Sequence, residues 1–351
     1  LKDTFIFLFT ISINWLLIKF VEEKKLRLWL AIPFNVILLA FFKYKNIFFN
    51  YGSFNLPLVS DYLPLGISFY CFQSIAYQVD LYKNLTKGAK NFKEFILFKS
   101  FFPQLIAGPI VRANDLIPQL RNDNKNRKKY RLICFGLLLC SLGLTKKIVF
   151  ADSISTLIDQ YFVSLPKTTM QAWLAAIMYS FQVYFDFSGY SDIAIGSAYL
   201  LNIRLPLNFK APYLSSTPSE FWRRWHISLS TWIRDYLYIP LGGSSGSYVR
   251  SNFIVILTMA IAGLWHGMNL NFLIWGIFWG IYICIGRFFK FKNIKPFYKW
   301  PLHFIIIVML WVLFRSPNLY YSFSYWSIML GVNNKHIVDL NASLSNSLEN
   351  P

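Results

Sequence analysis

Four histidines are the side chains of this sequence best suited to exchange protons near neutral pH, and one of them occupies a costly position. His266 ends an apolar run, and another apolar run starts at Phe272. An ionisable side chain at such a place is a functional hypothesis by default. Burial disfavours the imidazolium, which leaves a neutral ring able to take the proton of an attacking hydroxyl. A histidine that only satisfies a helix end explains these facts equally well.

A second histidine, His226, lies in a segment rich in aromatic and charged residues. The pattern predicts one helix over 218–238, capped by Thr217 or Ser215, with Glu220 at its positive end. At 3.6 residues per turn, one face of this helix carries Trp222, His226, Leu229 and Ile233, and another carries Arg224, Ser228, Thr231 and Asp235.

The remaining candidates for chemistry are weaker. His303 opens an apolar run and His336 lies in a polar tail, so we expect ordinary surface or helix-end roles for both. His and Cys residues show no pair at ligand spacing, and we expect no metal site. Ser188 follows the acidic Asp186 without a nearby base, so a nucleophilic serine is not indicated.

The elements that must position these residues are apolar helices. Of 351 residues, 55% are hydrophobic and 15% charged, and the mean hydropathy is +0.41. A large soluble helical protein would need polar helix faces, which these runs lack. A bilayer core takes roughly 20 helical residues, and the runs predict spans near 4–20, 26–42, 62–80, 95–111, 132–150, 169–187, 253–268, 271–286 and 302–330, the last in one or two pieces. The sequence therefore predicts one all-α, multi-pass membrane domain over 1–351.

The formal net charge is +19, which in a soluble protein would suggest nucleic acid. Here the basic residues lie between apolar runs, as expected of cytoplasmic loops, so we expect no nucleic-acid partner. The interval 202–250 breaks the pattern, because it carries four prolines and several charges among aromatic residues. Irregular backbone at membrane depth requires shielding by protein or a wet cavity, so this interval is predicted to be re-entrant or interfacial.

Several strings of this sequence resemble the membrane-bound O-acyltransferase family. They are PLGISFY at 64–70, FPQLIAGPIVR at 102–112, NFKAPY at 208–213, EFWRRWHISLSTW at 220–232, RDY at 234–236, YIPLGG at 238–243 and GLWHG at 263–267. The chain is similar to the bacterial branch that includes the alginate O-acetylation protein and the peptidoglycan O-acetyltransferase. Members usually carry further spans at both ends, so the chain resembles a domain truncated at both termini.

The resemblance implies a helical bundle around a central channel, with His266 as the catalytic residue and His226 as the second family histidine. It implies transfer of an acyl group, acetyl by expectation, from a cytoplasmic thioester across the bacterial cytoplasmic membrane to hydroxyls of an extracytoplasmic polysaccharide. His266 would act as base or as transient acyl carrier, and His226 would assist the donor side. No tightly bound cofactor is expected, and acetyl-CoA or a similar thioester would be the co-substrate.

The other expected site residues bind donor or substrate. Arg223, Arg224 and Arg234 would hold phosphates of the donor or of lipid headgroups. Asn269 would stabilise an oxyanion, and Trp222 and Trp265 would line the site. Expected partners are membrane lipids and a periplasmic acetyltransferase that passes the group to the polymer. Two alternatives stay open, a transporter with a histidine proton relay and a non-catalytic scaffold for that periplasmic enzyme.

Overall fold

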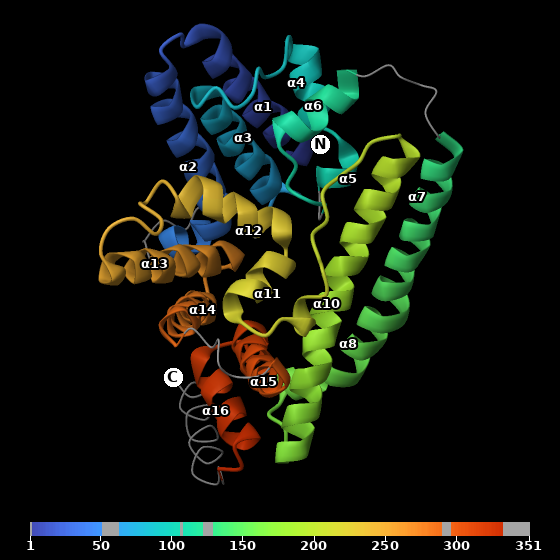
Figure 1. The fold of residues 1–351 in the computed structure, drawn as a ribbon, viewed down its shortest axis with the longest axis vertical. Helices are drawn as coiled ribbons and strands as arrows, with labels where there is room; N and C mark the ends of the chain where they lie inside the picture. Colours follow the sequence, from blue (N-terminus) through green and yellow to red (C-terminus); the bar gives the residue numbers. More distant parts are fainter. Residues whose placement is uncertain (1, 51–62, 106–107, 122–128, 290–295, 333–351) are drawn as a thin grey trace. The chain divides into compact units, whose positions relative to one another are not determined.

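The protein is described by a computed structural model over residues 2–50, 63–105, 108–121, 129–289 and 296–332. Every regular element in these ranges is a helix, which confirms the predicted all-α class (Figure 1). The chain forms two compact units. The first comprises Leu1–Lys146, Phe187–Pro212 and Trp222–Ser245, and the second comprises Lys147–Asp186, Tyr213–Phe221 and Gly246–Pro351.

Among the described residues, the helices that lie wholly in the first unit come mostly before the middle of the chain, and two short ones come after it. They are α1 (Lys2–Phe20), α2 (Lys24–Asn50), α3 (Ile67–Tyr82), α4 (Phe92–Lys99), α5 (Phe102–Leu105), α6 (Ala113–Arg121), α7 (Lys129–Leu144), α12 (Ile227–Ile233) and the π-helix η3 (Arg234–Tyr238).

The second unit contains α8 (Ser153–Ile158), α9 (Gln160–Val163), α13 (Tyr248–His266), α14 (Leu270–Phe288), α15 (Pro296–Arg315) and α16 (Leu319–Met329). Four elements have residues in both units: the π-helix η1 (Thr145–Asp152), α10 (Thr169–Leu200), the short 3-10 helix η2 (Pro212–Leu214) and α11 (Pro218–Arg224).

Six helical segments in the described part of the chain are long and apolar enough to cross a membrane. They are Lys2–Phe20, Lys24–Tyr44, Tyr130–Ile158, Tyr248–His266, Leu270–Phe288 and Tyr298–Arg315. The predicted multi-pass membrane protein is therefore confirmed.

The other predicted spans need correction. The span over 62–80 is the 16-residue α3, of which twelve residues are buried. The span over 169–187 belongs to the longer α10, where polar side chains interrupt the apolar sequence. The region over 302–330, predicted in one or two pieces, is two helices, α15 and α16, separated by a turn at 316–318, which confirms the second of these forms.

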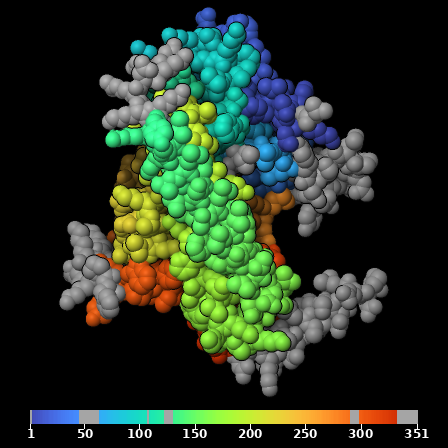
Figure 2. All heavy atoms as spheres, turned by 90° about the vertical axis from the view of Figure 1, so that its right-hand side faces the viewer, coloured from blue at the N-terminus to red at the C-terminus, as the bar shows by residue number. Residues whose placement is uncertain are grey.

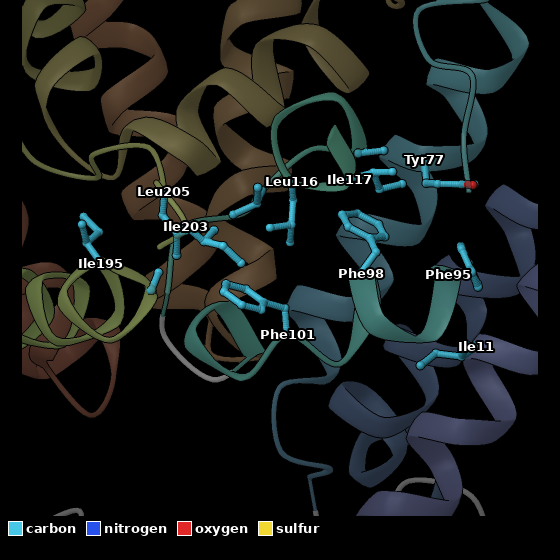
Figure 3. Packing of buried hydrophobic residues seen from close by; sticks show 13 residues of the cluster. Ile11, Tyr77, Phe95, Phe98, Phe101, Leu116, Ile117, Ile195, Ile203 and Leu205 are labelled. Atoms are coloured by element: carbon cyan, nitrogen blue, oxygen red, sulfur yellow. The ribbon is translucent and has the colours of Figure 1, made fainter. Parts of the chain in front are cut away.

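The predicted span over 95–111 is wrong because its apolar residues form a protein core. Phe95 and Phe98 on α4 are at most 1% exposed, and they pack with Tyr77 of α3 and with Leu116 of α6 (Figure 3). Ile203, in the loop after α10, joins the same cluster. Hydropathy reports only that these side chains avoid water, and it does not distinguish lipid from protein as their surroundings.

A buried amide pair joins the first two helices of this unit. Asn14 and Asn35 exchange hydrogen bonds of 3.0 and 3.2 Å, and neither side chain is exposed. Gln78 of α3 donates to the carbonyl of Asn14 at 3.1 Å. Between apolar helices such amide contacts fix the pairing and the register.

Helix α7 shows the features of a lipid-facing span. One face of the helix is uncovered in Figure 2. Its residues Leu138 and Leu142 are exposed. Its inner face meets α10 through glycines, because a Cβ on Gly136 would lie 2.7 Å from the carbonyl oxygen of Gly196. Small residues allow such close approach of two helices in a membrane.

Candidate active site

His226 lies at a sharp corner in the first unit. The single helix predicted over 218–238 is wrong, because α11 ends at Arg224 and α12 begins at Ile227 (Figure 1). Between them His226 adopts φ 39° and ψ 56°, the left-handed region that L-residues avoid. Its side chain is 4% exposed. Strained backbone of this kind persists only where the surroundings determine it strongly, and it concentrates at functional sites.

The loop before α11 supplies the hydrogen bonds that the broken helix lacks. The amide of Lys210 donates to the carbonyl of Arg224 at 3.0 Å, and the amide of Ile227 donates to the carbonyl of Asn208 at 2.9 Å. The Asn208 side chain also accepts a 2.6 Å hydrogen bond from the Ser228 hydroxyl. Asn208 is therefore a positioning residue that sequence reasoning missed, although it begins one of the strings that carry the family resemblance.

Aromatic rings surround the His226 imidazole. The ring of Phe187, on α10, meets it edge-to-face at 4.5 Å. Phe209 packs against Phe187 and against Trp225, in each case with ring centres 5.1 Å apart. His226 thus has a defined orientation in an apolar setting.

The three arginines predicted to bind phosphate differ in their surroundings. Arg223 is exposed, and Arg224 is partly buried with a long 3.4 Å contact to the carbonyl of Ala211. Arg234 is 59% exposed, and its Nε donates to Asp235 at 2.7 Å. Trp222, also predicted for this site, directly precedes Arg223 and is partly buried.

Asp235 connects Arg234 to a second guanidinium, that of Arg112, through an ion pair. Burial alone would raise the pKa of the Asp235 carboxyl, but hydrogen bonds from Arg234 and Arg112 hold that pKa below its ordinary value. Beside this pair, the Tyr236 hydroxyl donates to Asp80 of α3 at 2.8 Å. The network fixes η3, and therefore the end of α12, to α3 within the first unit.

His266 is the last residue of α13 in the second unit and is half-buried. Helices α13 and α14 form a tight hairpin around it, because Gly263 and Gly276 leave no room for a Cβ between the two backbones. A Cβ on Gly280 would similarly lie 2.7 Å from Ile256 Cα. The glycines set the spacing of the two helices that position His266.

Aromatic rings form a cage around the His266 imidazole. Phe314 of α15 and Trp275 of α14 meet it edge-to-face at 4.9 and 5.4 Å. Trp265 lies 4.6 Å from it and Phe272 lies 6.1 Å from it. The predicted site residue Trp265 is thus a wall of this cage.

A sequence profile of the membrane-bound O-acyltransferase family matches residues 87–323, which is more than half of the chain and includes both histidine sites. The chain belongs to the membrane-bound O-acyltransferase family.

The names of curated relatives in this family refer to several polymers. The chain is 40% identical to the probable alginate O-acetylase AlgI of Azotobacter vinelandii over 91% of the chain and 66% of that relative. It is 38% identical to the peptidoglycan O-acetyltransferase of Helicobacter pylori over 92% of the chain and 68% of that relative. It is 29% identical to the teichoic acid D-alanyltransferase of Bacillus subtilis over 67% of the chain and 61% of that relative. The chain thus spans about two thirds of the length of the relatives it matches.

In this membrane-bound O-acyltransferase chain, Asn269 caps a helix. Its side-chain oxygen accepts from the amide of Asn271 at 3.2 Å at the start of α14, and its side-chain nitrogen donates to the carbonyl of Pro317. The adjacent Asn271 donates to the carbonyl of Ser316 at 2.8 Å. The side chains of Asn269 and Asn271 thus attach the turn between α15 and α16 to the segment that follows His266.

His303 and two aspartates of α10 lie outside the two histidine sites. The surface or helix-end role expected for His303 is wrong, because its side chain is 2% exposed inside α15; His336 lies outside the described residues. Asp186 and Asp192 of α10 pair with Lys147 and Lys146 of η1 at 2.7 and 2.5 Å. Among the described residues no group of three or more His, Cys, Asp or Glu side chains is placed to hold a metal ion.

Proposed function

We propose that this chain is the core of a membrane-embedded O-acyltransferase of the bacterial cytoplasmic membrane. It transfers an acyl group, acetyl in the first instance, from a cytoplasmic thioester such as acetyl-CoA toward hydroxyls of an extracytoplasmic polysaccharide. The observation that carries the proposal is His266, a half-buried imidazole at the end of a candidate span, held in an aromatic cage. The names of the relatives support acyl transfer to polymers as its chemical class.

The proposed chemistry needs a group that moves a proton. His266 takes the proton from the acceptor hydroxyl as its oxygen attacks the thioester carbonyl, and the resulting imidazolium returns a proton to the thiolate when the C–S bond breaks. A positioned general base of this kind contributes about 10²- to 10⁴-fold in rate. In the alternative sequence of steps, His266 Nε2 or Nδ1 first receives the acyl group and the hydroxyl then displaces it. Both routes yield the same ester and free thiol.

The other site residues act on the donor in this proposal. Arg223 and Arg224 bind its phosphates, while Arg234 offers a guanidinium that already hydrogen-bonds Asp235. In the first unit, His226 orients the donor and Trp222 contacts it. In the second unit, Trp265 lines the cage of His266 and Asn269 stabilises the oxyanion. A lipid-headgroup role for the arginines uses the same charge-assisted hydrogen bonds. A periplasmic acetyltransferase completes delivery to the polymer.

The test is His266→Ala in the full-length parent protein, scored for polysaccharide acetylation at matched protein level in the membrane. We expect a loss of about 10²-fold or more, as for removal of a general base. His336→Ala, a histidine substitution in the polar tail, is the matched control and should retain acetylation. Acetylation that survives His266→Ala removes this residue from the mechanism, and survival of both His266→Ala and His226→Ala favours the scaffold alternative.

A transporter would behave differently from an acyltransferase. It would move a solute without consuming the thioester, and His266→Ala would then change flux but not acyl-group turnover. Measuring CoA release beside acetylation therefore separates these two functions in the same experiment.

A further inference from the structure

Both ring nitrogens of the buried His303 are hydrogen-bonded to hydroxyl groups. Nδ1 lies 2.7 Å from the Tyr282 hydroxyl, and Nε2 lies 3.1 Å from the Ser215 hydroxyl. A neutral imidazole has one donor and one acceptor nitrogen, and each hydroxyl can take either complementary role. The ring therefore cannot turn without losing a hydrogen bond in a buried place, where an unmade bond is expensive.

These contacts join three separate elements of the second unit. Tyr282 belongs to α14, His303 belongs to α15, and Ser215 lies in the segment that precedes α11. That segment continues into the N-terminal cap of α11, in which the amide of Glu220 donates to Thr217 Oγ1 at 3.2 Å and the amide of Ser216 donates to Glu220 at 2.9 Å. We call Ser215, Tyr282 and His303 the His303 clamp.

Aromatic contacts continue from the His303 clamp to His266. The ring of Tyr282 lies 5.6 Å from His303 and 6.1 Å from Trp279. Trp279 lies 6.4 Å from Trp275, which itself lies 5.4 Å from His266. Trp275 and Trp279 are at most 1% exposed, so these rings have little freedom to absorb a displacement.

The same two helices build the cage and the clamp. Trp275 precedes Tyr282 by seven residues on α14, or about 10 Å along the helix. Phe314 follows His303 by eleven residues on α15, or about 16 Å. Trp275 also stacks on Trp311 of α15, with ring centres 6.0 Å apart. The Tyr282–His303 hydrogen bond thus fixes the relative position of the two helices that carry Trp275 and Phe314, the cage walls of His266.

We infer that His303 is a positioning residue: through the Tyr282 hydroxyl it holds α14 and α15 in the alignment that orients the His266 ring. The expected change in turnover rests on the proposed function. The expected change in the exposure of the His266 ring to a modifying reagent does not. The inference assigns no contact between His303 and substrate.

The test compares four variants of the full-length protein in nanodiscs. Tyr282→Phe removes the hydroxyl, His303→Gln places an amide near the Nε2 position and keeps Ser215, and His303→Asn places an amide near the Nδ1 position and keeps Tyr282. Tyr248→Phe, at an exposed tyrosine that begins α13, is the matched control. Two quantities are measured: kcat and KM for acetyl-CoA, and the rate at which diethyl pyrocarbonate modifies His266, followed by peptide mass spectrometry.

We expect Tyr282→Phe and His303→Gln to lower kcat by about three- to tenfold, the factor that one hydrogen bond is worth, with KM nearly unchanged. Both should raise the modification rate of His266 by a similar factor, and His303→Asn should stay near wild type in both measurements. The inference is overturned if Tyr282→Phe matches Tyr248→Phe, or if His303→Asn is as impaired as His303→Gln. If wild type transfers no acyl group, the proposed function fails, and the modification rates alone decide the inference.

Discussion

Substituting Gly263 by alanine tests whether the close α13–α14 crossing positions His266. A Cβ on Gly263 would lie against the carbonyl oxygen of Phe272, 3.0 Å from its carbonyl carbon and 3.1 Å from Gly276 Cα. All three atoms belong to the backbone of α14, so no side-chain rotation relieves the clash. The two helices must separate by on the order of 1 Å, because packed helices have no spare volume.

Whether Gly263→Ala raises or lowers the stability of the protein distinguishes an open helix from a close helix crossing. Gly→Ala in an open helix interior gains about 1 kcal/mol, whereas overpacking costs about 1–3 kcal/mol. We therefore expect Gly263→Ala to lower the melting temperature in detergent instead of raising it. A 1 Å displacement of a reacting group costs up to about 10²-fold in rate, so acetylation by the full-length protein should fall more than stability alone explains.

The assay pairs a melting curve with acetyl transfer at a temperature well below the transition. Ile261→Ala, at an exposed position two residues earlier on α13, is the control and should change neither quantity much. A Gly263→Ala protein that melts at or above the wild-type temperature and retains full activity would refute the close crossing as the device that positions His266.

Three further substitutions test the rest of the account. Asn208→Ala removes the side-chain oxygen that accepts from the Ser228 hydroxyl beside the corner at His226. It should destabilise the protein by about 1–3 kcal/mol, measured by denaturation in detergent, and no change would contradict the assigned role. Because the pKa of Asp235 is lower in the folded protein than in the unfolded chain, its stabilising effect is complete above its ordinary pKa of about 3.9 and is lost as pH falls through the folded value. The stability difference between wild type and Asp235→Asn should therefore shrink in melting curves below about pH 4, and a constant difference would show that Arg234 and Arg112 do not stabilise this carboxylate. Asn35→Ala should cost about 0.6 kcal/mol by leaving Asn14 without its amide partner, and the double change of both to leucine should recover stability; equal losses in single and double variants would argue against the pair.

Apolar runs predicted the membrane helices well, because a lipid-facing helix is specified by its own residues. The run over 95–111 was misread for a definite reason. Phe95 and Phe98 are as apolar as lipid-facing residues, but they pack against α3 and α6. A fully buried Lys99, which donates to Ser74 at 2.9 Å, ends that helix. A lysine at this position argues against a lipid-facing span, but mean hydropathy over the run does not register it.

The site residues were readable in type but not in geometry. The family strings pointed to His226 and His266, yet periodicity placed His226 in the middle of a helix. The corner there depends on Asn208, which is distant in sequence and supplies the hydrogen bonds that replace the helical ones. His303 was missed for the same reason, because its partners Ser215 and Tyr282 are 88 and 21 residues away. Tertiary hydrogen bonds of this kind leave no local pattern.

The most direct measurement reconstitutes the full-length protein in vesicles with acetyl-CoA, labelled in its acetyl group, on one side of the membrane. We predict that wild type releases CoA in repeated turnovers only when a hydroxyl acceptor is supplied, with one label found on acceptor for each thiol released in those turnovers. We also predict that His266→Ala loses both signals together while keeping the wild-type melting curve. Label transfer by His266→Ala at the wild-type rate would contradict the central role of this imidazole.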